Sequence, residues 1–356
     1  MEPFTPLSVV DQLVAYFRES ISRGEMTEHM PGFRNLATKL GVSSTTVAAA
    51  VEQLEREGFV QQQGHGRRNL ITLPEHAATP AFRVTLLLYE REDLQLSHVA
   101  EIQQRLKEEG HEVSLADRSL VDLGMKVERI ARMVEQTKTD AWIIMSATME
   151  VLEWFVAQSM PAFALCGRFR PLPMAGTGPD KVGAFRAAIR RLAELGHRRV
   201  VLLQPDHMRK PTPGLLLRET LDEMESHGIK TGRYNLPDWE QTPEGLQRCL
   251  DSLFAVSPPT ALILDRACEY IGTQQYLAQR GILAPRDVSL ICTDDDFVFE
   301  WCEPPASCIR WESSPWVRRI VGWVGNVAKG KDDRRKSFSK AMFVEKASIG
   351  PVPNGQ

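Results

Sequence analysis

From about residue 82 onward, short apolar runs alternate with amphipathic helices of ten or more residues, and this alternation restricts the fold more than any other feature. Strands that are joined by helical crossovers form parallel sheets covered by helices on both faces. Seven such units are more than one sheet of ordinary size needs, so we expect two α/β lobes. The expected strands are 84–89, 113–116, 141–145, 162–165, 200–203, 261–264 and 288–292, and the expected helices are 97–109, 127–136, 182–195, 214–226, 245–254 and 268–279.

The first 73 residues follow a different pattern, in which three short helices precede a β-hairpin. Apolar side chains recur at helical spacing, glycines follow the helix ends, and Ser43 is placed to cap the third helix. The expected elements are a helix from Val10 to near Gly24, helices 33–40 and 43–57, strands 59–60 and 69–73, and a wing loop 63–68. We therefore expect a winged helix-turn-helix domain at 1–73, a linker at 74–81, and a two-lobed domain at 82–350.

This N-terminal pattern resembles the GntR family of winged-helix regulators. Many fixed spacings carry the resemblance, which implies that the third helix reads DNA. The matching residues are Pro31-Gly32, Arg34-Asn35-Leu36-Ala37, Leu40-Gly41-Val42-Ser43, Thr46-Val47, Ala50, Leu54-Glu55, Glu57-Gly58-Phe59-Val60 and the wing Gly64-His65-Gly66.

Small side chains cover the unburied side of the third helix near its N-terminus. They would let the helix enter a major groove, where hydroxyls meet base edges or phosphates and methyls meet thymine methyl groups. The resemblance also implies that an arginine of the second helix approaches DNA and that the wing tip enters the minor groove. The expected DNA-binding residues are Arg34, Ser43, Ser44, Thr45, Thr46, Ala48, His65, Gly66 and Arg67.

Two features depart from what a DNA-binding member of this family usually shows. Family members commonly carry arginine at the positions of Ser44 and Ala48, and arginine paired with guanine is the commonest specific base contact. Residues 1–80 hold seven Lys and Arg against nine Asp and Glu, a balance of −2, although phosphate neutralisation supplies much of the affinity for nucleic acid. DNA affinity must therefore come from local positive charge, helix N-termini and dimerisation.

The remainder of the chain, 82–350, resembles the LacI-type effector domain, which is itself similar to periplasmic sugar-binding proteins. This resemblance implies two α/β lobes around a ligand cleft. The phrases that carry it are Leu195-Gly196-His197-Arg198-Arg199-Val200, Pro259-Thr260-Ala261, Gly281-Ile282, Pro285-Arg286-Asp287-Val288-Ser289-Leu290, Asp294-Asp295 and Phe343-Val344-Glu345-Lys346.

Ligands of open α/β sheets bind beyond the carboxyl ends of the strands, and this rule selects candidate contacts. The resemblance also implies a stacking role for the tryptophan of Asp238-Trp239, with a place in the core as the alternative. Arg266 stands where the family has an amide or carboxylate that reads sugar hydroxyls, so it favours an anionic ligand. The alternative is that Arg266 only pairs with Asp294 or Asp265. The expected effector-binding residues are Tyr89, Ser146, Arg168, Trp239, Arg266 and Asp294.

Enzymatic and metal functions find no support in the sequence. There is no nucleophile elbow, P-loop, zinc-protease motif or dinucleotide fingerprint, and we expect no cofactor and no metal site. The six cysteines lack paired spacing and are expected to be reduced. No signal-like start or long apolar run occurs, so a cytoplasmic protein without a membrane segment is expected. The charged stretch 330–340 is interpreted as a solvated loop.

The sequence thus favours a ligand-responsive transcription regulator, a repressor by expectation, that acts as a homodimer on a roughly palindromic operator. Its small-molecule effector is expected to be sugar-like or anionic and to bind between the lobes. The alternative is a soluble ligand-binding or scaffold protein whose winged helix makes protein contacts.

Overall fold

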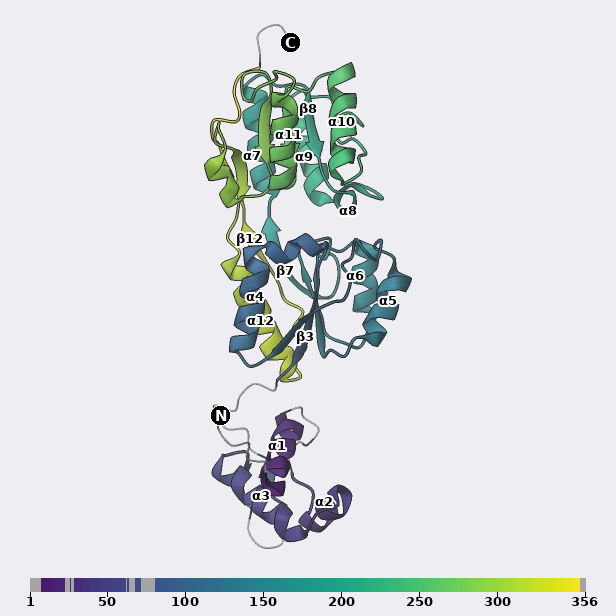
Figure 1. Ribbon diagram of the computed structural model, residues 1–356, viewed down its shortest axis with the longest axis vertical. Coiled ribbons are helices and arrows are strands. Elements are labelled where there is room, and N and C mark those ends of the chain that lie inside the picture. The colour runs from purple at the N-terminus through teal and green to yellow at the C-terminus, as the bar shows by residue number, and fades with distance from the viewer. Residues whose placement is uncertain are drawn as a thin grey trace. The chain divides into compact units, whose positions relative to one another are not determined.

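The computed structural model describes residues 8–22, 26, 29–61, 63, 68–71 and 81–352 (Figure 1). The chain divides into two compact units, and each is described by itself. The first unit consists of Met1–Ile144, Ala157–Phe163 and Val317–Arg335, and the second of Met145–Val156, Ala164–Trp316 and Lys336–Gln356.

The N-terminal part of the first unit is a three-helix bundle with a short hairpin, as predicted. Its core contains Phe17, Val47 and Leu54, all with no exposed area. Gly41 takes a left-handed conformation with φ of 67° after the second helix, where a residue without a Cβ is unstrained. The elements are α1 (Val9–Ser22), α2 (Phe33–Leu40), α3 (Ser44–Arg56) and the antiparallel strands β1 (Val60–Gln61) and β2 (Leu70–Ile71).

A six-stranded sheet has the order β12-β7-β6-β5-β3-β4. Its strands are β3 (Arg83–Leu87), β4 (Glu112–Leu115), β5 (Ala141–Met145), β6 (Ala162–Leu165), β7 (Ala175–Asp180) and β12 (Lys336–Lys340). In the first unit, α4 and α5 lie on opposite sides of β3 (Figure 1). The accompanying helices are η1 (Arg91–Gln95), α4 (Ser97–Glu108), α5 (Val127–Gln136), α6 (Met149–Val156) and α12 (Ser314–Ala328).

The expectation that 330–340 is a loop is wrong for its second half. Residues 336–340 form the edge strand β12, which pairs in parallel with β7 from Lys336 opposite Gly176 to Lys340 opposite Asp180. Four of its five side chains are at least partly exposed, so its composition is polar. An edge strand needs only one partner and one buried position, and apolar patterning therefore does not reveal it.

The second unit contains a five-stranded sheet of order β13-β11-β10-β9-β8, parallel except for β13. Its side chains alternate between two cores. Leu262 and Leu264 pack with α10 and α11, whereas Ala261 and Ile263 pack with α7 and α9. The strands are β8 (Val200–Leu203), β9 (Ala261–Leu264), β10 (Ser289–Cys292), β11 (Ser307–Arg310) and β13 (Met342–Val344).

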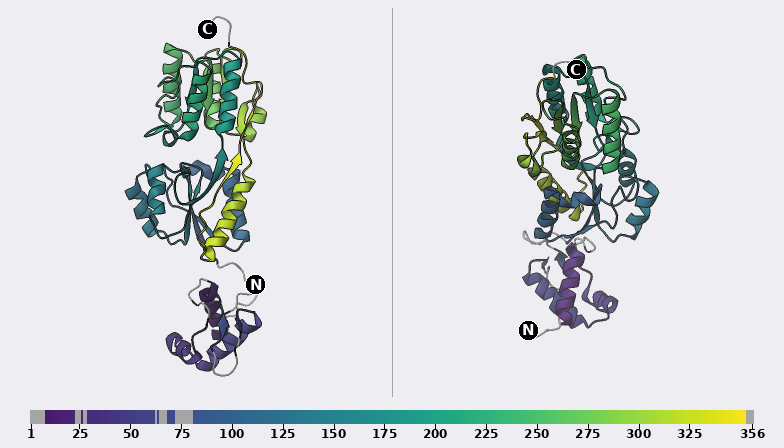
Figure 2. Two further views of the ribbon diagram at one scale, coloured as in Figure 1. Left: turned by 180° about the vertical axis from the view of Figure 1, so that it is seen from behind. Right: turned by 45° about the horizontal axis from the view of Figure 1, so that its top comes forward.

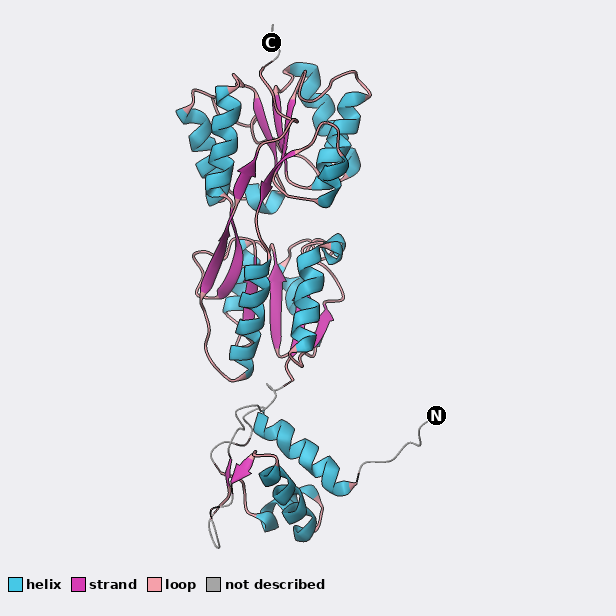
Figure 3. Ribbon diagram, turned by 90° about the vertical axis from the view of Figure 1, so that its left-hand side faces the viewer, coloured by secondary structure: helices cyan, strands magenta, loops and turns pink. Residues whose placement is uncertain are grey.

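The helices of the second unit cover both faces of this sheet, as Figures 2 and 3 show. They are α7 (Val182–Glu194), α8 (Asp206–Arg209), α9 (Leu215–Ser226), α10 (Pro243–Val256), α11 (Ala267–Ala278) and η2 (Phe297–Trp301). The prediction of parallel sheets with helices on both faces is confirmed. The predicted linker 74–81 lies outside the described residues except for residue 81. None of the described helices is long and apolar enough to span a membrane.

Candidate nucleic-acid interface and effector site

The N-terminal end of α3 presents hydroxyl groups on the surface of the winged helix. Ser44 and Thr45 are exposed, and Thr46 and Ala48 are partly exposed. Ser43 caps the helix, because its Oγ accepts a hydrogen bond from the Thr46 amide at 3.0 Å. The hydroxyl of Ser43 is therefore occupied, whereas Ser44 has no side-chain bond among the described residues.

Arg34 lies in the first turn of α2 and is exposed. No carboxylate of the described residues pairs with it, whereas Arg18 of α1 is bound to Glu57 at 2.6 Å. An exposed, unpaired arginine next to an exposed helix N-terminus suits a phosphate or a base edge. The other predicted contacts, His65, Gly66 and Arg67, lie outside the described residues.

In the second unit, the carboxyl ends of the parallel strands bring polar side chains together. The strands end level with one another, since Leu203 and Cys292 both stand opposite Leu264. Directly after these ends, Oγ1 of Thr293 donates to Oδ1 of Asp265 at 2.9 Å. This edge of the sheet is where ligands of such folds bind.

Lys181 and Trp311 extend the polar edge, although the sequence did not single them out. Nζ of Lys181 donates to the Thr293 carbonyl at 2.9 Å and lies 4.0 Å from the centre of the Trp311 ring. Burial raises the pKa of the neighbouring Asp294, and the charge of Lys181 opposes that rise. A lysine, a carboxyl group and an aromatic face at one edge can together read a polar ligand. Trp311 follows directly after β11, a strand that the sequence analysis missed, so its position could not be derived.

Arg266 pairs with Glu269, a residue that the sequence analysis did not consider as its partner. Its Nε lies 3.0 Å from Oε1 of Glu269, one turn into α11. Burial and, after it, the charge of Asp265 raise the pKa of Glu269 to about 7, although Arg266 opposes the rise. The guanidinium of this N-cap residue is thus engaged by the first turn of α11.

The environment of Trp239 is mostly that of a core residue, although its side chain also lines a pocket beside α10 and α11. The side chain is only 8% exposed, belongs to the core beneath α10 and α11, and donates from Nε1 to the Gln204 carbonyl at 3.2 Å. Its neighbour Asp238 accepts from Nη1 of Arg209 at 2.5 Å. The structure therefore favours the alternative weighed for Trp239, a place in the core.

Ser146 and Arg168 also belong to the second unit. Ser146 follows β5 with φ of 52°, and its amide donates to the Leu165 carbonyl at 2.9 Å. Arg168 is partly exposed and donates from Nη2 to the Met208 and Thr212 carbonyls at 2.7 and 2.8 Å. Tyr89 follows β3 in the first unit and is partly exposed.

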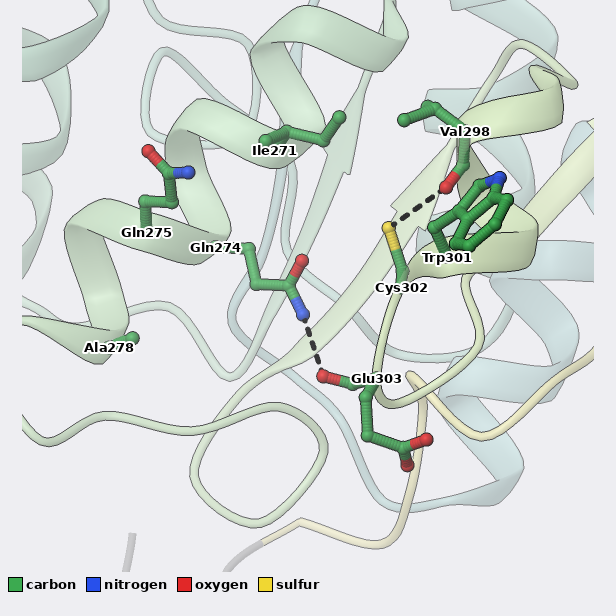
Figure 4. Close-up of a pocket in the computed structure, with 8 residues that line it drawn as sticks. All are labelled: Ile271, Gln274, Gln275, Ala278, Val298, Trp301, Cys302 and Glu303. Atoms are coloured by element: carbon green, nitrogen blue, oxygen red, sulfur yellow. Dashed lines mark hydrogen bonds between the residues drawn. The ribbon is translucent and has the colours of Figure 1, made fainter.

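An apolar groove of about 390 Å³ lies between α11 and the segment that follows β10 (Figure 4). Sγ of Cys302 donates to the Val298 carbonyl at 3.6 Å on one wall, and Nε2 of Gln274 donates to the Glu303 carbonyl at 3.2 Å across the groove. The lining residues are Ile271, Gln274, Gln275, Ala278, Val298, Trp301, Cys302 and Glu303.

Comparison with known proteins defines the class of both parts. Residues 9–67 match the family described as bacterial regulatory proteins, gntR family, and residues 189–348 match the periplasmic binding protein-like domain. The chain therefore combines a GntR-type helix-turn-helix domain with a periplasmic-binding-protein-like α/β domain, as the sequence predicted.

Individual proteins that resemble the chain are named as transcription regulators. The HTH-type transcriptional regulator AglR of Rhizobium meliloti (strain 1021) is 27% identical over 248 residues, which cover 63% of this chain and 65% of that protein. This chain spans less than two thirds of the length of the curated relatives it matches.

Two solved structures have the same fold at low identity. The transcriptional regulator CelR in complex with cellobiose has a TM-score of 0.61 at 17% identity, and the match covers 90% of this chain and all of that one. The lac repressor dimer bound to operator and the anti-inducer ONPF has a TM-score of 0.61 at 16% identity over 77% of this chain and 96% of that one.

Proposed function

We propose that the protein is a ligand-responsive transcription regulator that represses its target genes from the cytoplasm. The observation that carries the proposal is the exposed N-terminal end of α3, with Ser44 and Thr45 outward, in a chain that also contains a periplasmic-binding-protein-like domain. We assign DNA binding to 1–73, a linker to 74–81, and effector binding and dimerisation to 82–350.

In this proposal α3 enters the major groove of an operator half-site. Ser44, Thr45 and Ala48 contact base edges or thymine methyl groups, and Arg34 contacts a phosphate or a base beside them. The cap formed by Ser43 leaves the remaining amide groups of the first turn free to hold a phosphate. His65, Gly66 and Arg67 would follow the minor groove.

The effector binds at the carboxyl ends of β8, β9 and β10. Asp294 accepts hydrogen bonds from it, Lys181 donates to it, and the ring of Trp311 packs against its apolar face. Arg266 orients Glu269 instead of holding the ligand by itself. A small polar molecule, sugar-like or anionic, suits these groups.

A second copy of the chain covers the apolar groove of the second unit. Trp301 lines this groove and is 83% exposed, and Phe297 at the start of η2 is 79% exposed. In a two-fold interface each copy would place these exposed aromatic side chains against the groove of the other, where they become buried anchors. Two DNA-binding heads per dimer then match a roughly palindromic operator.

Selection of genomic fragments by the full-length protein tests the proposal. Fragments that bind should share a palindromic sequence located upstream of genes, and the Arg34→Ala variant should lose this enrichment. Binding of fragments without a common sequence by both proteins would contradict the regulator and favour the scaffold alternative.

A further inference from the structure

Two guanidinium groups of the second unit bind the segment from α8 to α9, and no carboxylate of the described residues pairs with either of them. Nη2 of Arg168 donates to the carbonyls of Met208 and Thr212, and Nη1 of Arg218 reaches the Pro213 carbonyl at 3.5 Å. All these partners are backbone oxygens of residues 208–213, so none of them neutralises either charge.

The environment of Arg168 is that of a cation without a counterion. Burial lowers the pKa of Arg168, and the positive charge of Arg218 lowers it further. Its Nε is buried and has no hydrogen-bond partner among the described residues. Bringing two like charges together in a partly buried site costs free energy unless an anion compensates them.

The N-terminus of α9 adds to the positive potential at this point. The guanidinium of Arg168 packs against Gly214, with its Nε 3.5 Å from where a Cβ of that glycine would stand. Gly214 is the N-cap, no side chain caps the helix, and no acidic residue occurs in its first turn. The amide groups of that turn therefore have no side-chain acceptor within the described part of the chain.

Two acidic side chains at α8 are already engaged. Asp206 binds Arg209 and Lys210, and Asp238 binds the same two cations. Arg209 is thus a buried arginine with two carboxylates, in contrast to Arg168, which has none among the described residues. Arg168 and Arg218, by contrast, have only backbone carbonyl partners among the described residues.

We propose that Arg168, Arg218 and the first turn of α9 bind a phosphate group of the effector. Two guanidinium groups and the free amides of a helix N-terminus can engage several oxygens and both charges of a phosphate dianion. This inference rests on the proposed function, since it names the chemical class of the ligand that the second unit senses. It also replaces Arg266 as the anion-reading residue.

Calorimetric titration of the full-length protein with inorganic phosphate, and with glucose 6-phosphate against glucose, tests this proposal at constant ionic strength. We expect saturable binding of both phosphates and weaker binding of glucose. Arg168→Gln and Arg218→Gln should each raise the dissociation constant roughly tenfold or more, because each removes charge-assisted hydrogen bonds. Arg286→Gln is the matched control, because this exposed arginine pairs with Asp287 at the amino end of β10 and should change nothing.

The outcomes separate this proposal from the one it rests on. Absence of saturable phosphate binding, or equal binding by all four proteins, would overturn the phosphate site. Arg218 is exposed, so its variant keeps the test valid even if Arg168→Gln misfolds. Operator binding is measured on the same samples without phosphate. Its presence together with a negative titration refutes only the phosphate site, and its absence refutes the regulator.

Discussion

Nε of Arg266 lies 3.0 Å from Oε1 of Glu269, and Oε2 of the same carboxylate accepts from the Arg266 amide at 3.3 Å. The glutamate therefore holds both the side chain and the backbone of the residue that caps the N-terminus of α11. It is only 4% exposed, so the ion pair lies at the boundary between the sheet edge and the core.

Glu269 makes stability depend on pH in a definite direction. Burial raises the pKa of Glu269 to about 7 in the folded protein, so the folded state binds a proton that the unfolded state has released. The free energy of unfolding should therefore fall as the pH rises from about 4.5 to about 7. Urea unfolding of wild type and Glu269→Gln across this range measures the effect, and the variant should show a smaller slope. Equal slopes would contradict the raised pKa.

Asp333 should contribute stability with the opposite pH dependence. Arg335, Asn326 and Arg319 bind its carboxylate and hold the pKa of Asp333 well below its usual range. Its contribution is therefore present above the unfolded pKa of about 3.9 and is lost as the pH falls further. Asp333→Ala should cost about 3 kcal/mol at pH 7, since the side chain is buried and Arg319 would lose its counterion.

Thermal or urea unfolding of this variant at pH 7 and pH 3 checks the prediction. Asp332→Ala is the control, because its carboxylate is exposed and pairs only with Arg334. If both variants lose the same stability at pH 7, the cluster around Asp333 does not have the role described.

The exposed aromatic residues of η2 should determine the oligomeric state. Trp301→Glu should weaken the dimer at least about 30-fold, as expected when a central aromatic contact worth 2 kcal/mol or more is lost. Sedimentation measures the shift toward monomer, and operator affinity should fall with it. Val256→Glu provides the comparison, because this side chain is 85% exposed at the end of α10 and does not line the groove. A dimer equally stable in both variants would refute the assigned surface.

Restoring arginine at Ser44 should change the base preference of α3. Ser44 is exposed at the start of the helix, so an arginine there can reach the guanine O6 and N7 atoms in the major groove. Ser44→Arg should favour guanine at one position per half-site by about 1–3 kcal/mol. Competition binding with operators substituted at single positions measures this preference. An unchanged preference would show that α3 does not face the bases there.

Much of the fold followed from local patterns in the sequence. The strands at 141–145 and 261–264 are fully buried apolar runs. Short apolar runs between helices can be recognised as buried strands from the sequence alone. The strand 175–180 contains two glycines and a proline, and 336–340 is polar, so neither has a strand-like pattern. Their pairing with each other is a long-range contact that local composition does not reveal.

The sequence predicted the positions of the candidate site residues after the strands better than it predicted the residues with which they pair. The rule that ligands bind beyond strand ends selected Arg266 and Asp294, which follow β9 and β10 of the five-stranded sheet, and Arg168, which follows β6 of the six-stranded sheet. The rule could not show that Arg266 pairs with Glu269. Position 266 lies between the end of a strand and the start of a helix, and an arginine is compatible with both. The burial of Trp239 likewise depends on the packing of α10 and α11. The polar sequence of the loop that contains Trp239 does not indicate this packing.

The dependence of DNA affinity on salt tests the central claim most directly. Fluorescence anisotropy with promoter DNA and with a scrambled duplex of equal length should show preferential binding of the promoter and a linear fall of log K with log salt. Arg34→Ala should weaken binding and reduce the salt slope by about 1, because one phosphate contact is lost. Arg105→Ala on α4 should leave both unchanged. Equal affinity for promoter and scrambled DNA, with the same slope for wild type and Arg34→Ala, would contradict the assignment of this protein as a DNA-reading regulator.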